Sequence, residues 1–125
     1  MAKKVKRGYM IFTNGTHGET EMVDDYRNIQ SNLEVDVFTI VNIKIGGRNY
    51  TLYCDDEGLL KDEVIFTAIC TNAREYYIAG NILIFKHHGS YNKSLDDKDI
   101  EIIKANMNPS RPHPNVAENI LRFEF

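Results

Sequence analysis

The sequence contains few residues that could cross-link the fold covalently and no segment that could anchor it in a membrane. Its 125 residues include two cysteines, three prolines and no tryptophan, and its longest apolar runs, such as residues 82–85, are far too short to span a bilayer. No signal-peptide core follows the start methionine. We therefore expect a soluble cytoplasmic protein in which Cys54 and Cys70 are buried free thiols rather than a disulfide pair.

An excess of charge of one sign is also missing. The 15 basic and 18 acidic side chains leave a net charge of −3, and this balance does not create the broad positive potential that supports affinity for nucleic acid. A basic cluster of Lys3, Lys4, Lys6 and Arg7 stands near the start, where a solvated terminus is the ordinary interpretation. We expect no direct binding to nucleic acid and no membrane association.

What the chain does contain is a clear β-hairpin signal between Val37 and Gly58. Two runs of alternating character flank Gly46-Gly47, the pattern of two strands joined by a two-residue turn with positive φ. The register that follows places these pairs on one apolar face: Ile45–Arg48, Ile43–Tyr50, Val41–Leu52 and Thr39–Cys54. The opposite face is mixed, with Phe38, Ile40 and Tyr53, and is expected to reach water.

Helical periodicity appears on both sides of the hairpin. Apolar residues recur at spacings of three and four between Met22 and Glu34, which predicts an amphipathic helix there. A second helix is predicted from Leu95 to Met107, because Ser94 is a good N-cap and two aspartates follow it. Two main helices are therefore expected.

Strand signals occupy most of the remaining chain. Residues 5–13 predict a first strand, and residues 76–86 predict a longer one with a bulge at Gly80. Residues 59–74 contain an apolar run that fits a helix or a strand, and we prefer an irregular or short helical crossover. In the tail, Val116, Ile120 and Phe123 fall on one helical face, which predicts a short helix that caps the core rather than one that binds a partner.

These elements together predict the α+β class. The single small domain over residues 1–108 would contain a four- to five-stranded antiparallel or mixed sheet and the two main helices. Residues 109–125 would form a Pro-containing C-terminal extension with the short helix. A chain of this length can bury a core of its own, at roughly two-thirds of its unfolded surface.

Three short motifs follow one another in an order that resembles a known family. They are Asp56-Glu57-Gly58 with Lys61, residues 78–84 around the central Gly80, and the run Ser94-Leu95-Asp96-Asp97. Over about Val5 to Met107 the chain is similar to the DUF3846 family of small bacterial and phage proteins. The family's Asn-Arg pair is missing around Phe66-Thr67. The resemblance implies a phage or mobile-element context rather than a defined activity.

The mixed hairpin face and its acidic exit are the predicted partner-binding surface. It comprises Phe38, Ile40 and Tyr53 with Asp55, Asp56 and Glu57. If no helix covers this face, it is an exposed patch of the kind that marks binding sites. We expect a non-enzymatic phage-type accessory protein that binds a host protein, for example as an inhibitor of host defence. The sequence is also compatible with a homodimer.

Two alternatives from other classes use different residues. A small-ligand or nucleotide-binding site would draw on Arg74, Tyr77 and His87. A metal-dependent hydrolase would draw on Asp56, Glu57 and His88, but the acids do not follow a Ca²⁺-loop spacing and adjacent histidines on a strand point to opposite faces. We therefore expect no catalytic residues, no metal and no cofactor.

Overall fold

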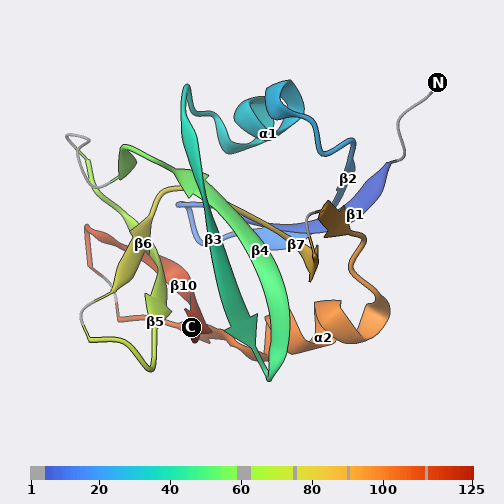
Figure 1. The fold of residues 1–125 in the computed structure, drawn as a ribbon. Helices are drawn as coiled ribbons and strands as arrows, with labels where there is room; N and C mark the ends of the chain where they lie inside the picture. The colour runs from blue at the N-terminus through green and yellow to red at the C-terminus, as the bar shows by residue number, and fades with distance from the viewer. Residues whose placement is uncertain (1–4, 59–62, 75, 90, 112) are drawn as a thin grey trace.

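Two β-sheets and two short helices make up the fold of the computed structural model, which describes residues 5–58, 63–74, 76–89, 91–111 and 113–125 (Figure 1). Sheet A has the order β2-β1-β7-β4-β3, with β8 added beside β7, and sheet B has the order β6-β5-β10-β9. The strands of sheet A are β1 Lys6–Ile11, β2 His17–Met22, β3 Phe38–Ile45, β4 Arg48–Asp55, β7 Ile82–His88 and β8 Tyr91–Lys93. Those of sheet B are β5 Phe66–Cys70, β6 Tyr77–Ala79, β9 Met107–Pro109 and β10 Val116–Phe123, and the helices are α1 Tyr26–Leu33 and α2 Asp97–Ala105.

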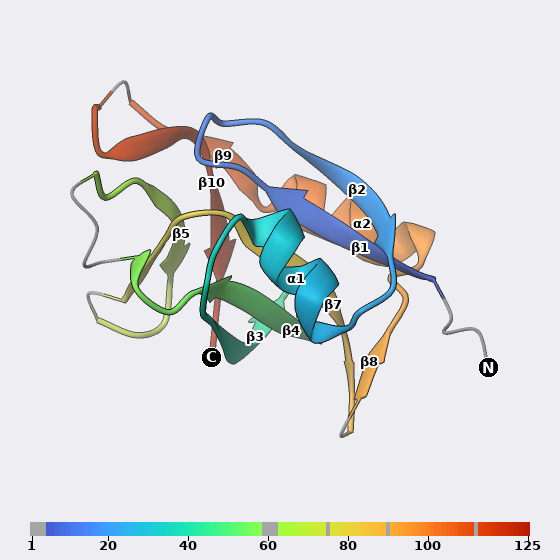
Figure 2. The same cartoon turned by 90° about the horizontal axis from the view of Figure 1, so that it is seen from above.

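Sheet A is the central layer. Helix α1 lies over one of its faces, while sheet B and α2 lie against the other (Figures 1 and 2). Two apolar clusters correspond to these contacts. The cluster under α1 includes Ile29, Leu33 and Phe85, and the larger cluster between sheet A, sheet B and α2 includes Leu52 and Phe123. Because strand side chains alternate between the faces, one sheet contributes to both cores.

The predicted α+β class is wrong, because the described chain is mostly β and has ten strands in two sheets. Three segments account for the difference. Residues 17–22 form strand β2 ahead of the first helix, which begins only at Tyr26. Residues 66–70, expected in an irregular or helical crossover, form strand β5, whereas residues 59–62 lie outside the described residues. The tail forms strands instead of a helix.

The tail lies within the fold. Strand β10 pairs in parallel with β5 and antiparallel with β9, and the proposed boundary at residue 108 falls inside β9. Leu121 and Phe123 are buried, so the relevant spacing is the period of two of a strand and not the helical spacing of Val116, Ile120 and Phe123. The prediction failed because the parallel partner, β5, is about 50 residues away in the chain.

Gly80 marks the change from one sheet to the other. The strand predicted over residues 76–86 is two strands, β6 in sheet B and β7 in sheet A, and Gly80 between them has a φ of +90°. The hydroxyl of Thr67 donates to the Gly80 carbonyl at 2.7 Å, and the Gly80 N–H donates to Ile65 at 3.0 Å. Residues with a side chain rarely adopt this φ, so glycine is required at the crossing.

The hairpin prediction is confirmed pair by pair. Every cross-strand pair between Phe38 and Asp55 follows the expected register about Gly46-Gly47, both of which have positive φ. Cys54 on its apolar face and Cys70 on β5 are both buried free thiols, as expected. A local alternation and a two-residue turn are sufficient to fix this register.

A buried carboxylate fixes α2 against sheet A. The side chain of Asp99 has no solvent exposure and accepts hydrogen bonds from Arg48 at 2.8 Å and Tyr50 at 2.9 Å, both on β4. Lys86 on β7 lies 3.3 Å away. Asp99 also closes a capping box with Asp96, which is the N-cap in place of the predicted Ser94. Burial alone would raise the pKa of Asp99, but the bonds from the Asp96 N–H, Arg48, Tyr50 and Lys86 outweigh it and lower the pKa to about 2.

We predict that Asp99→Asn lowers the free energy of unfolding at pH 7 by about 2 kcal/mol, because the two cations lose a buried anion but keep partial contact with water. Urea unfolding measures this change. The matched control is Glu101→Gln, since Glu101 is exposed on the same helix and its carboxylate lies 3.7 Å from the ammonium group of Lys98. Its effect should stay below about 0.5 kcal/mol.

The same carboxylate predicts a pH dependence. Its pKa is lower in the folded chain than the ordinary 3.8. Between these two values the unfolded chain binds more protons than the folded chain, so the free energy of unfolding decreases as the pH is lowered. The Asp99 contribution is complete above about pH 4 and is lost as the pH falls toward about 2. The difference between wild type and Asp99→Asn should therefore shrink over this window, and a constant difference would contradict the assignment.

We further predict that Phe123→Ala lowers the free energy of unfolding by about 3–5 kcal/mol, because it leaves a cavity where β10 meets the main core. Phe125→Ala is the control, since that ring is 44% exposed, and it should cost about 1 kcal/mol or less. Equal small effects from both variants, measured by urea unfolding, would favour the extension that the sequence suggested.

Candidate functional site

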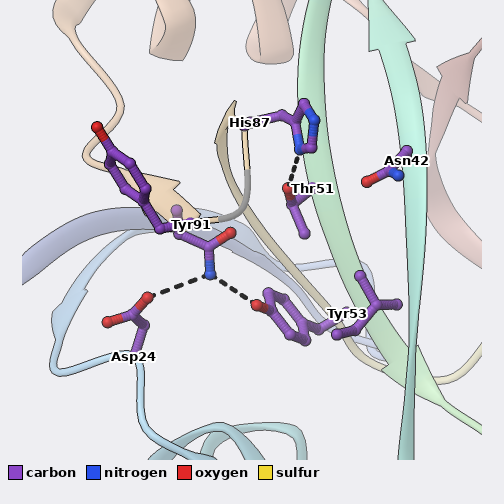
Figure 3. Close-up of a pocket in the computed structure, with 9 residues that line it drawn as sticks. Asp24, Asn42, Thr51, Tyr53, His87 and Tyr91 are labelled. Atoms are coloured by element: carbon purple, nitrogen blue, oxygen red, sulfur yellow. Dashed lines mark hydrogen bonds between the residues drawn. The ribbon is translucent and has the colours of Figure 1, made fainter.

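A pocket opens on the face of sheet A beside α1 (Figure 3). Its volume is about 320 Å³, at the lower end of the range for ligand pockets. Strands β3, β4, β7 and β8 form its walls together with the segment that leads into α1. The lining residues are Asp24, Ile40, Asn42, Thr51, Tyr53, His87, Gly89, Tyr91 and Asn92.

The wall formed by β8 contains a buried hydrogen-bond chain. Asn92 donates from its side-chain amide to the Tyr53 hydroxyl at 2.6 Å and to the Asp24 carboxylate at 3.2 Å (Figure 3). Lys6 donates to the same Asp24 oxygen at 2.9 Å and to the main-chain carbonyl of Asn92 at 2.8 Å. Strands β1, β4 and β8 and the segment before α1 are thereby joined at one point.

A second polar pair lies across the pocket. The hydroxyl of Thr51 is 3.1 Å from Nδ1 of His87, and the two side chains point toward each other in Figure 3. Thr51 is buried and His87 half-buried. Strand β8 returns beside His87 because Gly89, with a φ of +60°, allows the chain to reverse.

Exposed apolar side chains surround this pocket. Tyr26, Ile40 and Tyr91 are 57%, 55% and 57% exposed. The Tyr26 ring packs on Phe38 at a centroid distance of 4.9 Å, and Phe38 packs on the buried Tyr53 at 5.4 Å. Ile40 and Tyr91 line the pocket, and we call these two, with the adjoining Tyr26 and Phe38, the rim of the pocket. One edge of the rim is thus packed directly on the core.

The structure places the predicted partner-binding residues at the end of the hairpin that lies away from Gly46-Gly47. Ile40 and Tyr53 line the pocket and Phe38 packs on Tyr53, which contributes mainly from beneath because it is 7% exposed. The acids lie at the end of β4, where Asp55 is opposite Phe38 and accepts the Glu57 N–H at 2.9 Å in a tight turn. Asp55 lines a different cavity of about 230 Å³, while Asp56 and Glu57 are exposed.

The residues of the alternative ligand site are not brought together. His87 lies on β7 in sheet A, whereas Tyr77 lies on β6 in sheet B and packs against Phe66 at 5.3 Å. Arg74 is exposed in the loop before β6. The switch at Gly80 separates them, because it sends the two halves of the predicted strand into different sheets.

The proposed metal ligands are also apart. Strands β4 and β7 are antiparallel with Cys54 opposite Ile82, so the turn with Asp56 and Glu57 lies near the start of β7. His88 lies at its other end, roughly 26 Å away at the usual rise per residue, and packs on Tyr91 at 5.0 Å. Within the described ranges, no group of three His, Cys, Asp or Glu side chains is placed to hold a metal ion.

The buried thiol beside the acidic turn is poorly suited to nucleophilic chemistry. Burial, with smaller contributions from Asp55 and Asp56, raises the pKa of Cys54 to about 12. The thiol therefore stays protonated at neutral pH, whereas nucleophilic attack requires the thiolate.

Sequence reasoning missed the residues that build the pocket wall. Lys6, Asp24 and Asn92 are distant from one another in the chain and belong to no motif. The one local signal was Gly89, which ends a strand and can reverse the chain, with the strand former Tyr91 two residues later. Their convergence follows from the pairing of β7 with both β1 and β8.

Comparisons with known protein families, with curated proteins and with solved structures found no match. The resemblance to the DUF3846 family therefore stays a prediction from the motifs. In the portion of the chain that the structure describes, neither helix has the length and apolar character needed to cross a membrane.

We predict that Tyr53→Phe lowers the free energy of unfolding by about 1 kcal/mol, since it removes one buried hydrogen bond and leaves Asn92 bonded to Asp24. Tyr91→Phe is the control because its ring is largely exposed. Its loss should be below about 0.5 kcal/mol. Similar values for the two variants in urea unfolding would show that the Asn92 chain does not hold the wall.

Proposed function

We propose that this is a non-enzymatic binding protein that docks on a host protein through the rim of the sheet A pocket. The observation that carries the proposal is an exposed apolar set at one depression. Ile40 and Tyr91 line it at 55% and 57% exposure, and Tyr26, at 57%, packs on the neighbouring Phe38. Tyrosine is enriched among the residues that dominate binding energy, because it buries a large area and loses few rotamers.

The rigidity of the platform supports the proposal. Ile40 lies on a strand paired along its length with β4, and Tyr26 is held through Phe38 to Tyr53 and then to Phe85 by successive ring contacts of 4.9, 5.4 and 6.2 Å. Side chains already fixed in this way lose less freedom on association. The chain thus presents its apolar contacts in a nearly final arrangement.

The polar side chains of the pocket favour binding over catalysis. The Tyr53 hydroxyl and Asp24 accept from Asn92, and His87 bonds to Thr51. These bonds are made within the protein, so the groups support the wall rather than wait for a reacting atom. A small polar ligand in the same pocket is the second candidate, favoured by its volume alone.

The biological setting comes from the motif resemblance. Because this chain resembles the DUF3846 family of small bacterial and phage proteins, the proposed partner is a cytoplasmic protein of a bacterial host. Inhibition of host defence is one outcome of such binding. The charge balance of the chain agrees with a protein partner, because a nucleic-acid partner would favour a strongly basic surface.

We predict that capture from a lysate of the host bacterium recovers one stoichiometric protein, and that Tyr26→Ala with Tyr91→Ala weakens its binding at least about ten-fold. Titration of the purified partner against each variant measures this change. Tyr77→Ala is the matched control, since Tyr77 is similarly exposed but lies on sheet B.

Binding that is insensitive to the rim variants would contradict the proposed surface. A clear rise in Tm with nucleotides or other small polar ligands, absent in Tyr53→Phe or His87→Ala, would favour the second candidate. A ligand that binds only the native state must raise Tm.

A further inference from the structure

Among the described sheet edges, the outer edge of β3 is long and lacks the features that usually prevent another strand from pairing with it. Strand β3 is eight residues long and pairs with β4 on one side. On the other side, the described residues supply a single bridge, in which Lys44 and Glu124 exchange main-chain hydrogen bonds of 2.7 and 2.8 Å. Residues 38–43 contain no charge and no proline, the two devices that usually prevent strand addition.

The other described edges are protected. Strands β6, β8 and β9 are three residues each, and β9 ends at Pro109. Strand β2 carries Glu19 and Glu21. Short length, proline and charge all discourage the addition of another strand. The contrast within one molecule singles out β3.

The direction of the main-chain groups on β3 follows from the Lys44 bridge. Because the N–H and C=O of Lys44 point away from β4, the period of two makes those of Asn42, Ile40 and Phe38 point the same way. Ile40 is 55% exposed. The edge therefore presents a five-residue row of donors and acceptors between Phe38 and Asn42.

We propose that a second copy of this chain adds to β3, with the two β3 strands antiparallel about a two-fold axis at Ile40. This register places Ile40 opposite Ile40 of the second copy and Phe38 opposite its Asn42. Such a ladder makes up to about six main-chain hydrogen bonds. Each copy uses the same surface, as a two-fold interface requires.

The ends of the ladder fit this arrangement. Beyond Asn42 the β3 edge is occupied by Glu124. In the second copy the chain bends at Asp36 and Val37, just before its own β3, so it turns away where it would otherwise meet Glu124. The register brings Lys44 to the Asp36 end of the second copy, and both side chains are exposed. Two opposite-charge pairs, related by the axis, thus favour this register over a shifted one.

The dimer would also complete the pocket. Ile40 and Asn42 line it on the β3 side, and in the paired sheet the corresponding residues of the second copy lie beside them on the same face. The two pockets become neighbours on one continuous sheet. Because the ladder is short, the interface is small and the dimer is expected to be concentration-dependent.

Sedimentation equilibrium from about 1 µM to 1 mM tests this proposal. The wild-type chain should pass from monomer to dimer with no larger species. Ile40→Lys should raise the dissociation constant at least about ten-fold, since it sets two ammonium groups opposite each other at the axis. Tyr77→Lys, with a lysine on the short edge strand β6, should leave it unchanged.

A charge exchange tests the register. Asp36→Lys and Lys44→Asp should each weaken the dimer several-fold, and the double variant should restore it, because only the antiparallel register pairs these positions. A wild-type chain that stays monomeric to 1 mM overturns the proposal. It does so even if an extended peptide of another protein is found to pair with the β3 edge. So does a dimer that Ile40→Lys leaves intact.

This inference shares Ile40 with the proposed docking surface, but the two can be tested separately. Tyr91→Ala should weaken capture of the host protein without changing the dimer, since Tyr91 lies on β8, away from the edge. If the dimer forms and no host protein is captured, the proposed function fails and the edge assignment stands. Circular dichroism of each variant should show native strand content, so that a lost dimer is not mistaken for lost folding.

Discussion

Asp99 is fully buried and ionised, and three elements supply the groups that keep it so. Its partners on β4 and β7 and its own capping box fix where α2 begins. Helix α2 in turn delivers Ile100 and Ile103 to the main core and leads into β9. The Asn106 carbonyl that follows the helix accepts the Arg122 N–H at 2.9 Å, so the placement of sheet B depends on the same carboxylate.

Local patterns predicted what local interactions determine. The hairpin register required only the alternation about Gly46-Gly47, and the burial of Cys54 followed from it. The tail was misread because Val116, Ile120 and Phe123 fit a helix in isolation, whereas pairing with β5 selects a strand. At Met22, where the predicted helix began, pairing with β1 likewise selects a strand, since β1 pairs with β2 along its full length. Tertiary pairing overrides weak propensity in such cases.

The binding face was predicted in part for the same reason. Phe38, Ile40 and Tyr53 share one face of the hairpin, and the alternation in the sequence identifies that face. Their proximity could therefore be predicted. Lys6, Asp24 and Asn92 meet only because β7 has neighbours from both ends of the chain. Asp55 lies beside this face, opposite Phe38 in the β3–β4 pairing, whereas Asp56 and Glu57 are exposed in the turn that follows β4.

Among the described strands, β3 and β4 form the longest pairing between strands that are consecutive in the chain. Strand β7 must find β1 more than 70 residues earlier, with Leu83 opposite Met10, and β10 must find β5 across about 50 residues. Closing such long loops costs chain entropy before any contact rewards it. The chain is therefore expected to fold slowly for its size, with β3 and β4 formed early and the parallel strand pair formed late.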